Sequence, residues 1–234
     1  MDLRTGDVVR LNCEKRQVRV VDVSGEYFSV EMPWVRADPL SEYGGDVAYA
    51  FPRSPVSPEW GMTPFRFDED TTLLAVGDEV SISVPEMIAY ITSIDYYDPP
   101  LDTGTLPRPE VGINLLHYGT VRDPEDEEQG FSYNMPGDDF IHIEIIFRPY
   151  KFLVDGDIVI DDNNTRLKFT PPWHFIRDGE SHDTPPRWPL TLVEGFEQKI
   201  SNRNATVQNS TSTGSHEAEL AKWSRFSGVG ADTL

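Results

Sequence analysis

Apolar and polar residues alternate with a period of two along much of the chain. Residues 27–32, 79–84 and 166–169 place an apolar side chain at every second position. Because successive side chains of a β-strand point to opposite faces, this period predicts half-buried antiparallel strands. The 19 prolines and 17 glycines between such runs are typical of strands joined by many loops. The pattern predicts a mainly β protein built as an antiparallel barrel or sandwich with long proline-rich loops.

Two local features refine the first strands. Within residues 17–23 the alternation changes phase between Val20 and Val21, which predicts a β-bulge. Residues 24–26 then predict the turn into the next strand. The compact meander through residues 9–34 resembles the start of a small SH3-like barrel, which implies SH3-like or related small-barrel units.

A Gly-Asp pair recurs where three predicted strands begin, at residues 6–7, 77–78 and 156–157. Glycine permits a positive φ there, and the aspartate can accept a hydrogen bond from a neighbouring backbone amide. We therefore predict three similar turns. A pattern this short leaves open whether the three units are true repeats.

The composition changes near residue 200. Residues 1–199 are predicted to form a β-rich globular body with three candidate sub-units: 1–70, 71–155 and 156–199. Ten of the thirteen residues 201–213 are Ser, Thr, Asn or Gln, so we predict a flexible polar linker over 200–214.

Residues 215–234 form a tail that contains a predicted short amphipathic helix. Ser215 suits the N-cap, and Leu220, Trp223 and Phe226 are spaced to share one face. A helix this short is marginal in water by itself, so it needs a groove to fold into. The sequence leaves open whether that groove belongs to its own domain, to a second copy or to a partner.

The charge balance is strongly acidic, with 40 Asp and Glu against 20 Lys and Arg, a net charge of −20. This balance argues against duplex nucleic acid and anionic membranes as partners, because both require clustered cations. Residues 71–140 hold 14 acidic and 2 basic residues. Such a block attracts basic proteins. The predicted partner-binding set within this block is Asp95, Asp98, Asp102, Asp123, Glu125, Asp126, Glu127 and Glu128.

Few residues point to covalent or metal chemistry. Cys13 is the single cysteine, so no intramolecular disulfide is possible, and no zinc or nucleotide-binding motif occurs. Residues 102–105 match the Asp-Thr-Gly-Thr signature of aspartic proteases, but only one copy is present, and we predict a polar turn instead. We expect no metal and no cofactor. No run of 18 uncharged apolar residues and no secretory signal is visible, which favours a cytoplasmic protein.

The densest aromatic stretch offers the best position for an enzyme site. Two proline-flanked tryptophans, Trp173 and Trp188, bracket a loop with His174 and His182 and several carboxylates, which could supply acid and base groups. The simpler expectation is that both tryptophans close one end of the apolar core.

These observations favour protein binding without catalysis. The first hypothesis is an immunity or inhibitor protein whose acidic block covers the basic cleft of a partner such as a toxin. The second is an assembly component, in a virion or an injection machine, that self-associates through its tail. The third is a small-molecule enzyme with its site between Trp173 and Trp188.

Overall fold

The computed structural model describes residues 2–43, 47–123, 125–126, 129–138, 140–177, 180–181, 185–195 and 200–230. The protein is mainly β, with 40% strand and 14% helix, and contains a curled antiparallel half-barrel sheet and a C-terminal helix pair. The predicted fold class is therefore confirmed.

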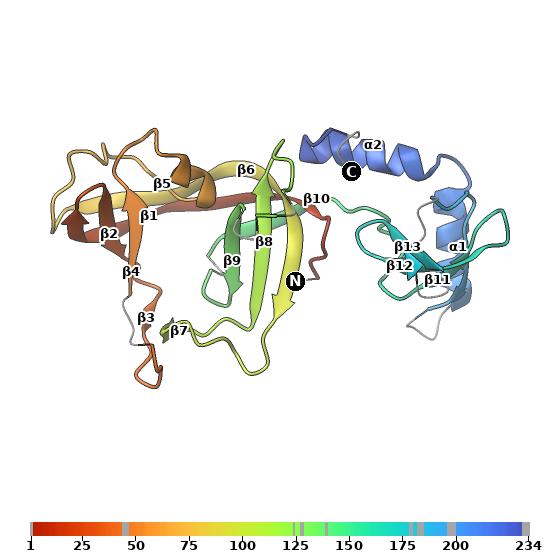
Figure 1. The fold of residues 1–234 in the computed structure, drawn as a ribbon, viewed down its shortest axis with the longest axis horizontal. Helices are drawn as coiled ribbons and strands as arrows, with labels where there is room; N and C mark the ends of the chain where they lie inside the picture. Colours follow the sequence, from red (N-terminus) through yellow and green to blue (C-terminus); the bar gives the residue numbers. More distant parts are fainter. Residues whose placement is uncertain are drawn as a thin grey trace. The chain divides into compact units, whose positions relative to one another are not determined.

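The chain divides into two compact units (Figure 1). Unit 1 comprises Met1–Val8 and Ile145–Leu234, and unit 2 comprises Val9–Glu144. These limits differ from the predicted sub-unit boundaries near residues 70 and 155. The first eight residues belong with the C-terminal part because Arg148 binds the Asp7 carboxylate, with 2.8 Å between Nε and Oδ1.

Unit 2 is built around one sheet with the strand order β4-β2-β1-β6-β8-β9, in which β10 also pairs with β1 and β5 with β6. Strands β3 and β7 form a separate two-stranded ribbon in the same unit. The elements are β1 (Val8–Ser24), β2 (Tyr27–Glu31), β3 (Arg36–Ala37), β4 (Ala48–Pro52), a 3-10 helix (Pro58–Met62), β5 (Arg66–Phe67), β6 (Glu79–Tyr96), β7 (Thr105–Leu106), β8 (Val111–His117), β9 (Phe131–Met135) and β10 (His142–Phe147).

The two long strands curl because each contains an irregularity. The register of β1 against β2 shifts between Val20 and Asp22, which confirms the predicted bulge, and Val21 is the exposed extra residue. The register of β6 against β8 shifts between Ile91 and Ser93. A bulge bends a strand and increases its twist, so both irregularities help the sheet to curl.

The core of unit 2 collects the apolar positions that the period of two predicts. Phe28, Val30, Val80 and Ile82 are all at most 1% exposed. The aromatic residues of the proline-rich loop after β4 pack against Phe51, which lies 5.0 to 6.2 Å from the ring centroids of Trp60, Phe65 and Phe67. These contacts fix the long loop to the sheet.

The three Gly-Asp pairs form the same turn. Each glycine has a positive φ (Gly6 +85°, Gly77 +98°, Gly156 +82°). In each turn the aspartate carboxylate accepts a hydrogen bond from the backbone amide three residues earlier, at 2.9 Å. A strand begins at the residue directly after each aspartate: β1 at Val8, β6 at Glu79 and β11 at Ile158. The predicted turns are therefore confirmed.

Unit 1 contains a five-stranded sheet with the order β14-β13-β12-β11-β15, followed by two helices. Its core surrounds Tyr150, which is fully buried, and includes Phe169, Leu190 and Leu192. The elements are β11 (Ile158–Ile160), β12 (Arg166–Thr170), β13 (His174–Arg177), β14 (Glu180–Ser181), β15 (Thr191–Glu194), α1 (Ile200–Thr211) and α2 (His216–Ser227).

The predicted flexible linker is wrong, because these residues form helix α1. The helix packs against β15. Two of its polar side chains accept hydrogen bonds from backbone amides in and just before that strand: Asn204 Oδ1 from the Leu192 amide at 2.9 Å, and Thr211 Oγ1 from the Leu190 amide at 2.8 Å. Arg203 binds the fully buried carboxylate of Asp157. The polar composition that resembles a linker is thus a set of hydrogen-bond partners for buried groups.

The tail helix α2 forms as predicted and packs within its own unit. The Ser215 hydroxyl accepts from the Ala218 amide at 3.2 Å, and Gly228 ends the helix with φ +76°. Trp223 is 2% exposed and donates its indole N–H to the Gly6 carbonyl at 2.8 Å. Leu220 is half-buried, and Phe226 is 39% exposed and stacks on Phe147, so the predicted apolar face is only partly buried.

A second set of contacts fixes the start of α2. The Tyr150 hydroxyl lies 2.6 Å from His216 Nδ1, and the Tyr150 amide donates to Glu219 at 3.2 Å. Burial lowers the pKa of His216, against the opposing influence of Glu217 and Glu219, and His174 lowers it further. Neutral His216 can accept the tyrosine hydrogen bond.

The role of Thr211 provides a test of the α1 packing. Thr211→Val keeps the side-chain shape but leaves the buried Leu190 amide without an acceptor, so we expect a loss of about 1–3 kcal/mol in the free energy of unfolding. The measurement is urea denaturation of the full chain. The matched control is Thr206→Val on the exposed side of α1, for which a change within about 0.5 kcal/mol is expected. Equal effects of the two variants would show that Thr211 has no special role.

The buried imidazole of His216 makes the attachment of α2 dependent on pH. Its pKa is lower in the folded protein than the value of about 6.5 in an unfolded chain. Stability from the neutral form is therefore complete above pH 6.5 and declines as the pH falls from there toward the folded pKa. We expect amide hydrogen exchange in residues 216–227 to accelerate over this range, and less so in His216→Gln. The comparison variant is His117→Gln, whose pKa is also lowered but which lies in unit 2. Exchange that depends on pH equally in all three proteins would contradict the prediction.

Candidate functional site

The candidate site lies in unit 2, where the segment after β2 meets the loop before β8. The β3–β7 ribbon joins them through the pairs Arg36 with Leu106 and Ala37 with Thr105. The loop contains the turn at residues 102–105, in which Asp102 Oδ1 accepts from the Gly104 amide at 3.0 Å and Gly104 has φ +78°. This is the polar turn that the sequence predicts for the protease-like tetrapeptide.

An ion pair between a half-buried arginine and a buried aspartate fixes the ribbon. Arg108 Nε donates to Asp38 Oδ2 at 2.6 Å, and its Nη2 lies 3.4 Å from Asp102 Oδ2. The Asp38 side chain is only 3% exposed and also accepts from the Leu40 amide at 2.8 Å. One guanidinium therefore links both segments, and its planar fork suits two carboxylates at once.

The same contacts determine the charge states. The Leu40 amide and Arg108 lower the pKa of Asp38, and the Gly104 amide, a hydrogen bond from the Ser41 hydroxyl and Arg108 lower the pKa of Asp102. The hydrogen bond to Asp38 raises the pKa of Arg108. All three groups are charged at neutral pH, and the cation of Arg108 is balanced by two anions.

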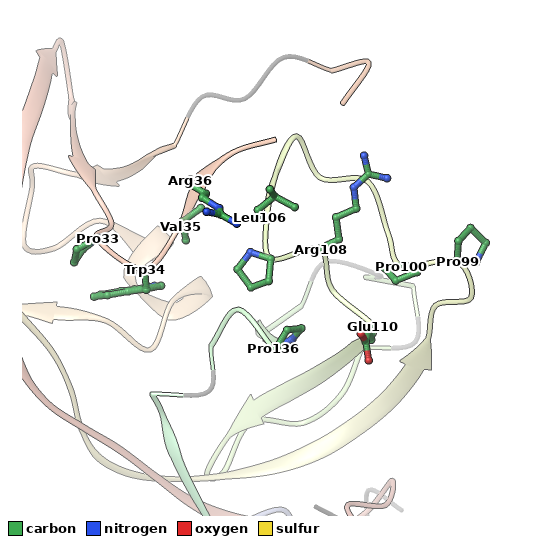
Figure 2. A pocket seen from close by; sticks show the side chains of 11 residues that line it. Pro33, Trp34, Val35, Arg36, Pro99, Pro100, Leu106, Arg108, Glu110 and Pro136 are labelled. Atoms are coloured by element: carbon green, nitrogen blue, oxygen red, sulfur yellow. The ribbon is translucent and has the colours of Figure 1, made fainter. Parts of the chain in front are cut away.

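Beside the ribbon lies a groove with a volume of about 690 Å³ (Figure 2). Proline rings provide much of its wall, together with the side of Trp34, whose ring centroid lies 4.2 Å from that of Phe140. The groove is lined by Pro33, Trp34, Val35, Arg36, Pro99, Pro100, Leu106, Pro107, Arg108, Glu110 and Pro136. Prolines have few internal degrees of freedom, so the walls are rigid before any ligand arrives.

The groove has one cationic and one anionic side. Arg36 is exposed and forms no ion pair with any residue that the structure describes. Glu110 is exposed as well, and so is Asp98 next to the Pro99 rim; within the described ranges neither carboxylate pairs with a cation. Figure 2 shows Arg36 and Glu110 apart from each other, with Leu106 near Arg36. A bound chain would meet an anion on one side and a donor-rich guanidinium on the other.

A smaller hollow of about 210 Å³ lies against the same ribbon. It shares Val35, Leu106 and Pro107 with the groove and is otherwise lined largely by polar side chains, among them Tyr49. Burial raises the pKa of the Tyr49 hydroxyl, helped by the charge of Asp138. The ribbon is thus exposed to two hollows of different polarity.

The predicted acidic set is divided between two places. Asp95, Asp98 and Asp102 belong to the end of β6 and the loop before β8, near the groove. Asp123, Glu125 and Asp126 lie in the loop after β8, at the other end of that strand. Glu127 and Glu128 lie outside the described residues. The seven residues of β8 separate the two groups by about 23 Å.

The predicted enzyme cleft is occupied by core packing as far as the structure describes it. Trp173 packs edge-on against Trp223 with 4.9 Å between ring centroids, and Trp188 packs edge-on against Tyr150 at 6.1 Å. His174 is exposed on β13, and His182 lies outside the described residues. Both tryptophans thus contribute to the unit 1 core, as the simpler expectation has it.

Sequence reasoning missed the groove residues, above all Asp38 and Arg108. Their contact joins positions 70 residues apart, which no local pattern reveals. One signal was present: Arg108 is one of only two basic residues in 71–140, and it stands between two prolines. A lone cation in a rigid, acidic segment indicates an internal ion pair.

Comparison with known proteins gives no match: no protein-family model, no curated protein and no solved structure resembles the chain. No helix in the described part of the chain is long and apolar enough to cross a membrane. Within the same residues, no group of three or more His, Cys, Asp or Glu is placed to hold a metal ion.

Loss of the ion pair should open the groove. Arg108→Ala leaves the buried Asp38 carboxylate without its cation, so we expect a lower melting temperature and faster amide exchange in residues 36–40 and 102–108. Arg108→Lys keeps the charge but cannot bridge both carboxylates, and an intermediate effect is expected. The control is Arg122→Ala, an exposed arginine in the same acidic block. Unchanged exchange in Arg108→Ala would show that other contacts hold the ribbon.

Proposed function

We propose that this protein is a non-catalytic binding protein whose acidic unit 2 binds a basic protein. The observation that carries the proposal is the division of charge between the units. Residues 9–144 hold 26 acidic and 9 basic residues, which is −17 of the total charge of −20. A field of one sign over one compact unit accelerates encounter with an oppositely charged partner.

The acidic loop after β8 supports the proposal because side-chain hydrogen bonds hold the backbone of its described residues. Asp123 Oδ1 accepts from the Glu125 amide at 2.9 Å, and Gln129 Oε1 accepts from the Asp123 amide at 2.7 Å. The Gln129 side chain also donates to the Val121 carbonyl at 3.0 Å. Asp123, Glu125 and Asp126 are exposed on this loop. Residues whose backbone is already held by such hydrogen bonds lose little conformational entropy when a partner binds.

Several cations of unit 2 are engaged with carboxylates of the same unit, so each neutralises a neighbouring carboxylate and forms no positive patch of its own. Arg10 binds Glu144 with 2.6 Å between Nη1 and Oε2, and Lys15 binds Asp68 at 2.6 Å. Arg108 is balanced by two carboxylates, as described above. The carboxylates that remain unpaired set the sign of the surface.

The specific form that we propose is an inhibitor or immunity protein that covers the basic cleft of a partner such as a toxin. The two acidic loops, separated by the length of β8, are about as far apart as the width of a standard protein interface. The alternative of assembly through the tail has less support, because Trp223 is buried within its own unit. The enzyme alternative has no observation in its favour beyond exposed His174.

The test is capture of partners by the immobilised full-length chain from its native source, followed by titration of the purified partner. We expect one basic protein at equal stoichiometry, released by high salt. The variant Asp123→Asn with Asp126→Asn should bind about twofold to thirtyfold more weakly, because each exposed ion pair contributes about 0.2–1 kcal/mol.

The control for this variant makes the same chemical change in unit 1, as Asp155→Asn with Asp162→Asn, both exposed. Its affinity should equal that of the unmodified protein. Recovery of further copies of the chain alone, or binding that does not respond to salt, would contradict the proposal.

A further inference from the structure

We infer that the groove beside the β3–β7 ribbon binds an extended segment of the basic partner, with an apolar side chain against Trp34 and the prolines and a lysine or arginine beside Glu110. The inference rests on the proposed function and adds the docking site and the chemistry of the docked segment. Its first support is the volume of the groove. This volume, about 690 Å³, lies within the range of about 300–1,000 Å³ that is typical of ligand sites.

The second support is that the groove exists before binding. Its walls are proline rings and the backbone of a ribbon that Arg108 ties to Asp38. Trp34 is half-buried and is held by Phe140 and by Arg16, whose guanidinium carbon lies 5.6 Å from the Trp34 ring centroid. A preformed apolar wall gains affinity because few side chains have to be ordered on binding.

The third support is charge complementarity, which selects the occupant. Glu110 lines the groove, Asp98 lies at its proline rim, and both are exposed without a cationic partner in the described chain. Arg36 on the other side can donate hydrogen bonds from its N–H groups to the backbone carbonyls of an extended segment. A second copy of the chain would bring another net charge of −20, which disfavours it as the occupant.

The probes for the test are three fluorescein-labelled peptides of twelve residues, titrated against the full-length protein by fluorescence anisotropy. The first combines leucine and proline with arginine, the second replaces arginine by glutamate, and the third replaces leucine and proline by serine. We expect binding of the first peptide, no binding of the second and at least about tenfold weaker binding of the third.

Two variants assign this binding to the groove. Glu110→Lys replaces an attraction by a repulsion and should weaken the first peptide by about tenfold, whereas Glu79→Lys, an equally exposed change at the far end of β6, should leave it within about twofold. Trp34→Phe keeps an aromatic ring for Phe140 but reduces the wall, so it should weaken the peptide as well. A thermal melt of each variant checks that unit 2 remains folded.

The outcomes separate this inference from the proposed function. Equal losses in Glu110→Lys and Glu79→Lys, or equal binding of the first and third peptides, would overturn the inference, because charge alone would then explain binding. If the captured basic partner binds Glu110→Lys and Trp34→Phe as tightly as the unmodified chain, the groove is not the docking site although the proposed function stands. If neither a basic protein nor the first peptide binds, both fail.

Discussion

Two aspartates at strand-opening turns, Asp7 and Asp157, are fully buried, and the packing of unit 1 depends on how their charge is met. Each accepts a hydrogen bond from an amide of its own turn, which leaves most of the charge uncompensated. A buried carboxylate is costly unless a cation with good geometry accompanies it. Arg148 meets Asp7 and Arg203 meets Asp157. One pair attaches the first residues of the chain to its C-terminal half, and the other attaches helix α1 to the sheet.

The third Gly-Asp turn, at residues 77–78, shows which features can be predicted from the sequence and which cannot. Asp78 accepts the same turn hydrogen bond but is exposed, and within the described residues no arginine forms an ion pair with it. The turn, the strand that follows it and the bulge at Val21 depend on neighbouring residues, so they could be predicted from the alternation of apolar and polar positions. Helix α1 could not, because Asn204 and Thr211 favour linkers in general and are helical here through hydrogen bonds to the amides of Leu192 and Leu190, beyond the reach of a local pattern.

The candidate site could be predicted only in part, because it too depends on contacts between residues far apart in the sequence. Its acidic character follows from composition, and the turn at Asp102 follows from local chemistry. The groove itself depends on the pairing of β3 with β7, which are short strands far apart in the chain. Two-residue strands leave no periodic signal, and the contact between Asp38 and Arg108 becomes visible only in three dimensions. The predicted acidic set divides between the two ends of β8 because this strand lies between the two groups in the sequence.

Charge and shape have different consequences for binding by unit 2. The net charge of −17 produces a negative field over the whole of unit 2. This field mainly raises the association rate of a basic partner, and salt weakens it. The groove acts only on contact and mainly affects how long the partner stays, since differences in affinity between related complexes are chiefly differences in dissociation rate. An acidic surface alone would bind many basic proteins weakly. A rigid apolar groove with one available carboxylate and one available guanidinium, Glu110 and Arg36, adds the positional requirement that distinguishes one partner from the rest.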